Sequence, residues 1–233
     1  MKSHGVIFDS ALVEIRAAEG GNDAKLLVED LFKIYEKWCR IKNFSIEVSY
    51  ICSSRIEFVI KGKKAYKLFL PEAGGHRFQR IPPTEKKGRR HTSTVTVAVL
   101  PIVPEVEFRI NEKDLRWSTT TARGHGGQNV NKLETAVRLE HIPSGIVVNC
   151  QDERKQGQNK KRALDILRTK LYAKHMRESS DKENSSRRTQ IGSGQRGDKI
   201  RTLRYQDGKV TNHLNGKKVN LTEVLNGNLD ILR

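Results

Sequence analysis

A ten-residue stretch in the middle of the chain constrains the fold more than any other. It reads Arg-Gly-His-Gly-Gly-Gln-Asn-Val-Asn-Lys from Arg123 to Lys132 and places three glycines within four positions. Glycine leaves the backbone almost free of side-chain constraints, so the stretch predicts an exposed loop tip, not a helix or strand. The Gln128 amide offers both a donor and an acceptor. The two glycines before it allow its backbone to approach another surface closely.

The simplest interpretation of a bare Gly-Gly-Gln tripeptide is a mobile turn that precedes a helix. The wider context favours another, because the ten residues and three later segments resemble the Gly-Gly-Gln loop of class I peptide chain release factors. These segments are residues 134–139 (ETAVRL), 141–148 (HIPSGIVV) and 150–154 (CQDER). The resemblance covers nearly the whole chain. It implies a protein that enters the ribosome at a stop codon and triggers hydrolysis of peptidyl-tRNA, with Gly126, Gly127 and Gln128 at the reacting centre.

The charge balance indicates a polyanionic partner. The chain has 233 residues, enough for one or two domains with a real core. Lys and Arg together number 44 against 27 Asp and Glu, which gives a formal net charge of +17. Such an excess neutralises phosphates and releases counterions. It favours nucleic acid over the alternative of an anionic membrane surface.

The cysteines predict no disulfide framework and no zinc site. Cys39, Cys52 and Cys150 are widely spaced and odd in number, with no C-x-x-C pair. They are expected to be buried thiols in a reducing compartment. No metal or cofactor is expected. Because no apolar run reaches 18 residues, and none opens the chain, neither a membrane span nor a signal peptide is expected.

The first part of the chain predicts a strand followed by an amphipathic helix. Residues 13–17 alternate between apolar and polar, which is typical of a strand. After a glycine turn, residues 23–40 carry one apolar stripe at spacings of three and four. The stripe consists of Leu27, Leu31, Ile34, Tyr35 and Trp38. Asn22 is the expected N-cap, and Asp23 lies in the first turn, where the helix dipole favours a carboxylate.

Two further strands, at residues 45–51 and 55–60, are expected to pair. Residues 73–85 are expected to form one rigid, exposed loop, because the adjacent Pro82 and Pro83 cannot donate to a strand ladder. Residues 94–100 alternate again and predict a strand. Taken alone, the proline segment is an ordinary loop. Its Thr, Gln and His side chains also suit the reading of single-stranded bases by hydrogen bonds and stacking.

The tripeptide Pro82-Pro83-Thr84 matches the Pro-x-Thr motif of the bacterial release factors of the first type, which read UAA and UAG. The resemblance implies that Thr84 contacts the purine edge of the second codon base. It also implies that His91 stacks between the second and third bases.

The same resemblance assigns the other two codon positions. Gln79 and Thr92 are expected to receive the unstacked third base. The turn at Gly20 and the helix tip at Asp23 are expected to touch the first base. Family members that read UAG carry Glu where this chain has Asp23, so the charge is kept on a shorter side chain.

The middle of the chain predicts a second, smaller sheet. Residues 106–110 and 115–119 alternate as strands, and residues 132–135 suit a short helix. Residues 136–141 and 145–151 predict a hairpin across the turn Pro143-Ser144-Gly145.

Residues 155–174 predict a long helix. Its expected buried face comprises Ala163, Ile166, Leu167, Leu171 and Tyr172. The opposite face is basic; it is either simply solvated or, because the same domain carries the glycine loop, a phosphate-binding surface. The expected phosphate contacts are Arg123, Lys132, Lys160, Lys161 and Arg162. Residues 177–188 have mixed charges and no apolar period, so they predict a helix extension or a linker.

These elements together predict an α+β fold with two domains. A codon-recognition domain, with a mixed sheet and a helix, is expected from residues 1–111 and 191–233 and includes a short helix around Leu221, Val224 and Leu225. A smaller βαβ-type Gly-Gly-Gln domain, with an antiparallel hairpin and the long helix, is expected at 112–190. Residues 193–202 resemble the family's return segment between these domains. Full-length relatives carry a helical N-terminal domain before the first strand, and this chain begins just ahead of that strand, so a compact factor or a truncated one is expected.

The expected chemistry depends on Gln128. Its side chain cannot act as a general base at neutral pH, so the ester of peptidyl-tRNA needs a positioned water and a stabilised oxyanion. The Gln128 backbone N–H is expected to stabilise the developing charge, while the side chain excludes larger nucleophiles. The ribosome supplies the rest of the site, so the chain is expected to trigger hydrolysis without being a free-standing enzyme. The resemblance also implies possible N5-methylation of Gln128.

The expected partners are the ribosome, at its decoding and peptidyl-transferase centres, the mRNA stop codon, the P-site peptidyl-tRNA and a glutamine methyltransferase. A monomer is expected, in the bacterial cytoplasm or in the matrix of a mitochondrion or plastid. Two other functions stay open. The first is a codon-independent rescue hydrolase for stalled ribosomes, and the second is an RNA-binding module with no hydrolytic role.

Overall fold

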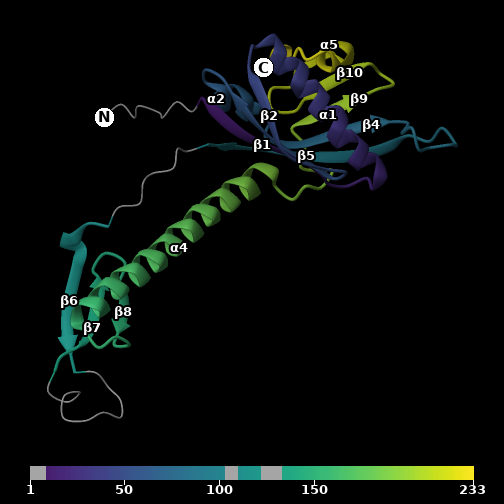
Figure 1. Cartoon of the computed structure of the whole chain (residues 1–233). Helices are drawn as coiled ribbons and strands as arrows, with labels where there is room; N and C mark the ends of the chain where they lie inside the picture. Colours follow the sequence, from purple (N-terminus) through teal and green to yellow (C-terminus); the bar gives the residue numbers. More distant parts are fainter. Residues whose placement is uncertain (1–8, 103–109, 122–132) are drawn as a thin grey trace. The chain divides into compact units, whose positions relative to one another are not determined.

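The computed structural model describes residues 9–102, 110–121 and 133–233. Its residue contacts divide the chain into two compact units (Figure 1), Met1–Pro104 with Glu183–Arg233, and Glu105–Lys182. Each unit combines a largely antiparallel sheet with helices, which confirms the predicted α+β class. The domain boundaries drawn from the sequence at residues 111 and 190 stay a prediction.

The large unit contains an eight-stranded sheet in the order β11-β10-β9-β4-β5-β1-β3-β2. Its strands are β1 (Ser10–Ala17), β2 (Ser45–Cys52), β3 (Arg55–Lys61), β4 (Gly74–Arg80), β5 (His91–Pro101), β9 (Arg201–Arg204), β10 (Lys209–Asn212) and β11 (Lys218–Asn220). All neighbours are antiparallel except β4 and β9, which are parallel. Pairing of β4 with both β5 and β9 therefore joins the C-terminal segment to the N-terminal sheet.

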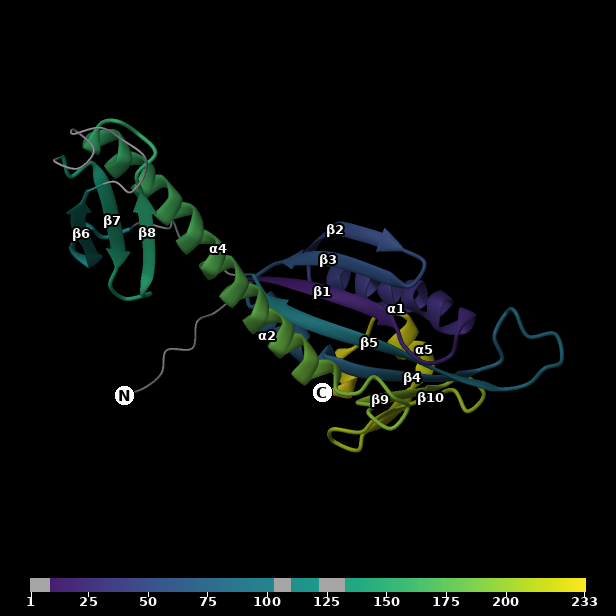
Figure 2. The ribbon, with the colours of Figure 1, turned by 90° about the horizontal axis from the view of Figure 1, so that it is seen from below.

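Helix α1 (Asn22–Ile41) lies across one face of this sheet (Figure 2). All five residues of the predicted stripe are buried, which confirms the amphipathic prediction. Short helices complete the layer: α2 (Ala65–Phe69), the 3-10 turn η1 (Leu70–Glu72), α5 (Leu221–Leu225) and the 3-10 turn η3 (Asp230–Leu232). The expected C-terminal helix is α5, whereas the sequence pattern missed β9, β10 and β11 because each has only three or four residues.

The prediction of one exposed loop over residues 73–85 is wrong for its first half. Residues 74–80 form β4, which is mostly buried. A Cβ on Gly75 would lie 2.0 Å from the Asp198 carbonyl oxygen, and the Gly75 carbonyl accepts a hydrogen bond from Ile200 N at 2.8 Å. Glycine in a strand marks such a close backbone approach. The glycines that suggested a loop are there to let another segment dock.

Helix α4 (Gln156–Ile191) is continuous, so residues 177–188 extend the helix. Its last turns belong to the large unit and contact the sheet there. Arg187 donates to both carboxylate oxygens of the buried Glu14 at 2.6–3.1 Å. The Gln190 amide exchanges two 2.8 Å hydrogen bonds with the backbone of Val99. Because the β4 ladder ends opposite Val97, Gln190 satisfies the next backbone groups along β5.

The small unit consists of a three-stranded sheet and the first part of α4. Strands β6 (Leu115–Thr120), β7 (Ala136–His141) and β8 (Ile146–Cys150) are all antiparallel, and the 3-10 turn η2 (Glu112–Asp114) precedes them. The predicted hairpin is confirmed. The βαβ arrangement is wrong for the described residues, because βαβ requires parallel strands.

Apolar residues from β7, β8 and α4 form the core of the small unit. They are Val137, Leu139, Val148, Cys150, Ala163, Leu167 and Leu171. Tyr172 was predicted to be buried but is 52% exposed, whereas its neighbour Leu171 is buried in the core. Leu133 to Thr135 are not helical. The rest of the helix expected at 132–135, and residues 106–109 of an expected strand, lie outside the described residues.

A buried polar network joins β4, β9, η1 and α1 in the large unit. Arg201, 3% exposed, pairs with Glu72, which is fully buried. The His76 ring nitrogen lies 2.9 Å from the Glu72 carbonyl oxygen and 3.5 Å from the Tyr35 hydroxyl. Burial lowers the pKa of His76 to about 4, and the Arg201 charge acts in the same direction. The His76 ring is therefore neutral at pH 7.

Cys39, Cys52 and Cys150 are all free thiols, as predicted, although Cys52 is only half-buried. Burial raises the pKa of Cys39 to about 12, so this thiol is unreactive. None of the helices in the described part of the chain is long and apolar enough to cross a membrane.

Candidate functional site

A loop joins β4 to β5 (Figure 2), and the predicted tripeptide lies in it, shortly after β4 ends at Arg80. Glu85 N donates to the Pro82 carbonyl oxygen at 3.0 Å, which closes a β-turn with Pro83 and Thr84 at its centre. Proline suits the first central position because its φ is already fixed near the required value. Pro82 is buried, whereas Pro83 and Thr84 are exposed. The turn therefore presents the Thr84 hydroxyl on a rigid support.

Glu85 organises the rest of this loop, and sequence reasoning missed it. Its Oε1 accepts from Lys87 N at 2.7 Å, and its Oε2 accepts from the Arg89 guanidinium at 3.1 Å and from His91 Nε2 at 2.9 Å. The hydrogen bond from Lys87 N, with those from Arg89 and His91, lowers the pKa of Glu85. The side chain is only 6% exposed. A carboxylate can only accept, so His91 donates through Nε2 and its ring orientation is fixed.

Gln79 and Thr92 face each other across the base of the hairpin, as partners in the β4–β5 register. Arg204 Nε donates to Gln79 Oε1 at 3.2 Å, and Tyr205 N donates to the Gln79 carbonyl oxygen at 3.0 Å. The Gln79 amide is therefore oriented with its carbonyl engaged and its NH₂ group as the remaining donor. The turn after β9 supports the hairpin base, a role that its sequence did not reveal.

The N-terminus of α1 is attached to the same end of the sheet. Gly20 has φ +126°, and a Cβ there would lie 2.4 Å from Ser93 Oγ and 2.9 Å from Ser93 Cα. Only glycine fits this approach. The predicted N-cap is wrong: Gly21 occupies the cap position without a side-chain cap, and Asn22 is the first helical residue.

Asp23 is buried, and both of its carboxylate oxygens are engaged within the chain. Oδ1 accepts from Arg80 Nε at 2.9 Å, and Oδ2 accepts from Ser93 Oγ at 2.7 Å. Arg80 also donates to Asp30 at 2.7 Å. Burial of the Arg80 guanidinium disfavours its charge, but the hydrogen bonds to Asp23 and Asp30 outweigh burial and raise its pKa. Asp23 thus fixes α1 to the base of the hairpin.

These contacts bring all eight predicted codon-binding residues to one end of the large unit. They are Gly20, Asp23, Gln79, Pro82, Pro83, Thr84, His91 and Thr92. Sequence reasoning missed the residues that hold them, chiefly Arg80, Glu85, Ser93 and Tyr205. The Tyr205 ring lies 5.9 Å from the Arg80 guanidinium. The sequence did contain a signal for the strand that carries Arg80. Residues 74–80 alternate as a strand does, but the two glycines at the start of this segment obscured the pattern.

The predicted catalytic residues, Gly126, Gly127 and Gln128, lie outside the described residues, as do Arg123 and Lys132. The structure describes the two places where this loop joins the small unit. Thr119, near the end of β6, donates through Oγ1 to Glu134 Oε2 at 2.6 Å. Lys160 and Lys161 are exposed near the start of α4. Arg162 pairs with Glu153 at 3.1 Å and Asp152 at 3.8 Å, so its charge is partly neutralised.

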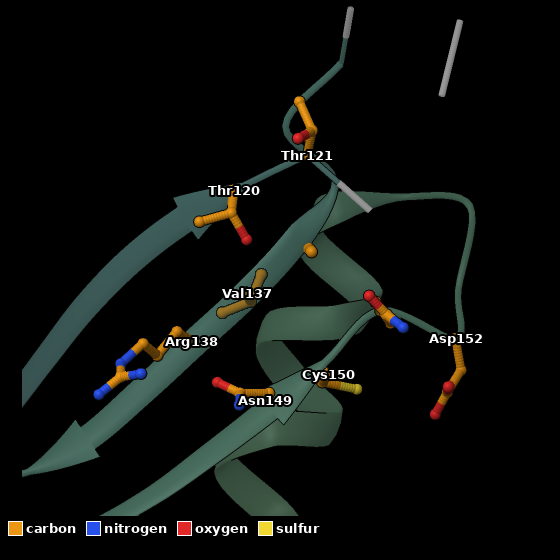
Figure 3. Close-up of a pocket in the computed structure, with 9 residues that line it drawn as sticks. Thr120, Thr121, Val137, Arg138, Asn149, Cys150 and Asp152 are labelled. Atoms are coloured by element: carbon orange, nitrogen blue, oxygen red, sulfur yellow. The ribbon is translucent and has the colours of Figure 1, made fainter. Parts of the chain in front are cut away.

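An open, polar cavity of about 490 Å³ lies beside these junctions. Figure 3 shows Thr120 and Thr121 at the end of β6, and Asn149 and Cys150 at the end of β8, with β7 between them. Val137, Arg138 and Asp152 complete the labelled lining, and the last two carry opposite charges. Among the residues that the structure describes, no cluster of His, Cys, Asp or Glu could hold a metal ion.

Two domain families match the chain. Residues 8–97 match the PCRF domain, and residues 104–214 match the RF-1 domain. Peptide chain release factor 1 of Thermotoga maritima is 45% identical over 229 residues, covering 95% of this chain and 67% of that protein. Peptide chain release factor 1 of Dictyoglomus turgidum is 46% identical over 228 residues, covering 94% of this chain and 62% of that protein.

A solved structure supports the same relationship. RF2 of Thermus thermophilus aligns with a TM-score of 0.56 and 33% identity, over 98% of this chain and 67% of that chain. The chain belongs to the peptide chain release factor family. Its sequence relatives here are named release factor 1, as the tripeptide Pro82-Pro83-Thr84 predicts. The chain spans about two thirds or less of the length of these relatives.

Proposed function

We propose that the chain reads the stop codons UAA and UAG in the ribosomal A site and triggers hydrolysis of peptidyl-tRNA. The observation that carries this proposal is the β4–β5 hairpin. Its turn presents Pro83 and Thr84, Glu85 fixes the orientation of His91, and Gln79 faces Thr92 below them. Membership of the release factor family supports the assignment.

In this proposal the hairpin reads the second and third bases. The Thr84 hydroxyl both donates and accepts, so it suits the edge of either purine at the second position. The His91 ring stacks between the second and third bases. The free NH₂ group of Gln79 and the hydroxyl of Thr92 bind the third base, and these groups tolerate both A and G.

The first base lies at the N-terminus of α1. Because both Asp23 oxygens are engaged by Arg80 and Ser93, the contact there comes from the backbone of the Gly20 turn and the first helical N–H groups. Those N–H groups have no partner within a helix. Asp23 acts in this proposal by positioning the turn.

The hydrolytic step belongs to Gly126, Gly127 and Gln128. The oxygen of a water attacks the ester carbonyl carbon, the bond to the tRNA 3′ oxygen breaks, and the proton is transferred to that oxygen. The backbone N–H of Gln128 stabilises the developing oxyanion, and its side chain, N5-methylated by a glutamine methyltransferase, excludes larger nucleophiles. The phosphates of rRNA and tRNA are bound by Arg123, Lys132, Lys160, Lys161 and Arg162.

The partners in this proposal are the decoding and peptidyl-transferase centres of the ribosome, the mRNA stop codon and the P-site peptidyl-tRNA. The chain acts as a monomer in the bacterial cytoplasm, since the named relatives are bacterial proteins. Residues 1–111 with 191–233 form the codon-reading part, and residues 112–190 form the hydrolytic part.

The test is release of labelled formyl-peptide from ribosomes with UAA, UAG, UGA or a sense codon in the A site. We expect release on UAA and UAG alone, and loss of release with Gly127→Ala. As a matched control, Gly197→Ala changes an exposed glycine that has no positive φ and no heavy atom within 4 Å of its Cβ, and should retain hydrolysis. Equal release on every codon would support a rescue hydrolase, and no release would favour an RNA-binding module.

A further inference from the structure

The side-chain amide of Asn159, in the first turn of α4, is fully buried in the small unit. Its Oδ1 accepts from Glu153 N at 3.0 Å and lies 3.5 Å from the Cys150 thiol. Its Nδ2 donates to the Glu153 and Thr135 carbonyl oxygens, both at 2.9 Å. All four hydrogen-bonding positions of the amide are therefore used. A fully satisfied buried amide fixes the groups around it in one arrangement.

Two more hydrogen bonds link the same neighbourhood. Gln156 Nε2 donates to the Glu134 carbonyl oxygen at 2.9 Å. Thr119 Oγ1 donates to the Glu134 carboxylate at 2.6 Å. We call Thr119, Glu134, Thr135, Gln156 and Asn159 the root clamp, because they hold the chain on both sides of residues 122–132.

The root clamp includes hydrogen bonds that the start of helix α4 does not require. The two bonds between Asn159 and Glu153 would be enough to fix the turn that leads into α4. The bonds to the Thr135 and Glu134 carbonyls reach instead to the segment that re-enters the sheet at β7. The Thr119 bond then joins that segment to the end of β6. Helix α4 thus adds to the β6–β7 ladder, whose last pair is Thr120 with Ala136, in holding the described residues at both ends of the glycine loop.

We propose that Asn159 is a positioning residue for the release reaction, and that the root clamp sets the place from which Gln128 is presented. This inference rests on the proposed function. In the proposed function, Gln128 admits water and excludes larger nucleophiles. Weakening the root clamp slows hydrolysis, since a misplacement of the reacting groups by about 1 Å can cost about 100-fold in rate. It also admits those nucleophiles.

The experiment compares water with hydroxylamine as the nucleophile in codon-dependent release. Hydroxylamine nitrogen attacks the same ester carbonyl, gives the peptidyl hydroxamate and frees the tRNA 3′ hydroxyl, to which a nitrogen-bound proton is transferred. For Asn159→Ala we expect the maximal rate of hydrolysis to fall by about 100-fold, with an unchanged half-saturating concentration. The ratio of hydroxamate to acid should rise. For Thr119→Val, which keeps the shape and removes one hydrogen bond, we expect a change of about fivefold.

The matched control is Ile166→Val, which trims a partly buried side chain packed against the core of the same unit without touching the root clamp. It should lower the amount of active protein while the hydroxamate-to-acid ratio stays at the wild-type value. If wild type releases peptide and both clamp variants keep the wild-type ratio, the positioning role is wrong while the proposed function stands. If wild type releases nothing on any codon, the proposed function is wrong and the positioning role falls with it.

Discussion

The two units differ in the size of the hydrophobic core that supports their proposed functional segments. In the described residues, the large unit has a core cluster of 25 buried residues, whereas the small unit has seven. The hairpin proposed to read the codon is fixed to the large core through the buried Asp23–Arg80 pair and organised from within by Glu85. The two ends of the glycine loop are held by the β6–β7 ladder, which ends at Thr120 and Ala136, and by a few hydrogen bonds from α4. Because the core of the small unit is small, each polar contact there contributes a larger share of the unit's stability.

The largest expected effect tests this difference in core size directly. Leu167 in the small unit and Leu203 in the large unit are both buried. Each Leu→Ala change should cost about 2–5 kcal/mol of unfolding free energy. That loss should unfold the small unit selectively in Leu167→Ala, but only weaken the large unit in Leu203→Ala. Hydrogen exchange resolved by unit measures this. Equal protection of both units in both variants would contradict the comparison.

The second prediction concerns pH and should affect the large unit alone. The pKa of His76 is about 4 in the folded chain, against about 6.5 in an unfolded one. As pH falls below 6.5 the unfolded state takes up a proton that the folded state does not, so stability is lost until about pH 4. Between pH 7 and pH 5 the loss is about 2 kcal/mol.

The control for this pH effect is His76→Gln, which keeps a hydrogen-bonding side chain and removes the titration. Denaturant unfolding at the two pH values should show a smaller acid loss for this variant than for the wild-type chain. An unchanged acid loss in His76→Gln would show that other groups cause it.

The sequence predicted the large elements well because their signals are long. The stripe of α1 repeats over five buried positions, and the β7–β8 hairpin is marked by a turn whose Gly145 has φ +66°. The candidate codon residues were predicted from their resemblance to a family. Residue chemistry alone left the proline segment as an ordinary loop.

The supporting residues could not be predicted, because their roles depend on contacts between distant segments. Asp23 lies 57 positions from Arg80, and Arg187 lies 173 positions from Glu14. Gly75 looked like part of a loop because the segment around Asp198 that docks on it lies far along the chain. Patterns within one segment report local conformation, whereas partner identity is a property of the fold.

The third prediction tests whether the codon hairpin is organised from within. Glu85→Gln keeps the size of the side chain but removes the charge that Arg89 and His91 approach. The His91 ring should lose its fixed orientation, and discrimination of UAA over a sense codon should fall about tenfold, equivalent to about 1.4 kcal/mol. The measurement is the ratio of release efficiencies on the two codons. Thr84→Ala should reduce the same ratio, whereas Lys86→Ala, at an exposed neighbour, should leave it unchanged.

The smallest expected effect distinguishes the charges on α4. Lys160 and Lys161 are exposed, whereas Arg162 is already paired with Glu153 and Asp152. If the basic face binds phosphates, each Lys→Ala change should lower the slope of log affinity against log salt by about one, because one fewer counterion is released. Arg162→Ala should lower the slope less, since its charge is partly neutralised before binding. Affinity for ribosomes should fall equally on stop and sense codons, because phosphate contacts carry no sequence information. A codon-dependent loss would mean that the small unit takes part in codon reading, and the division of labour between the two units would then be wrong.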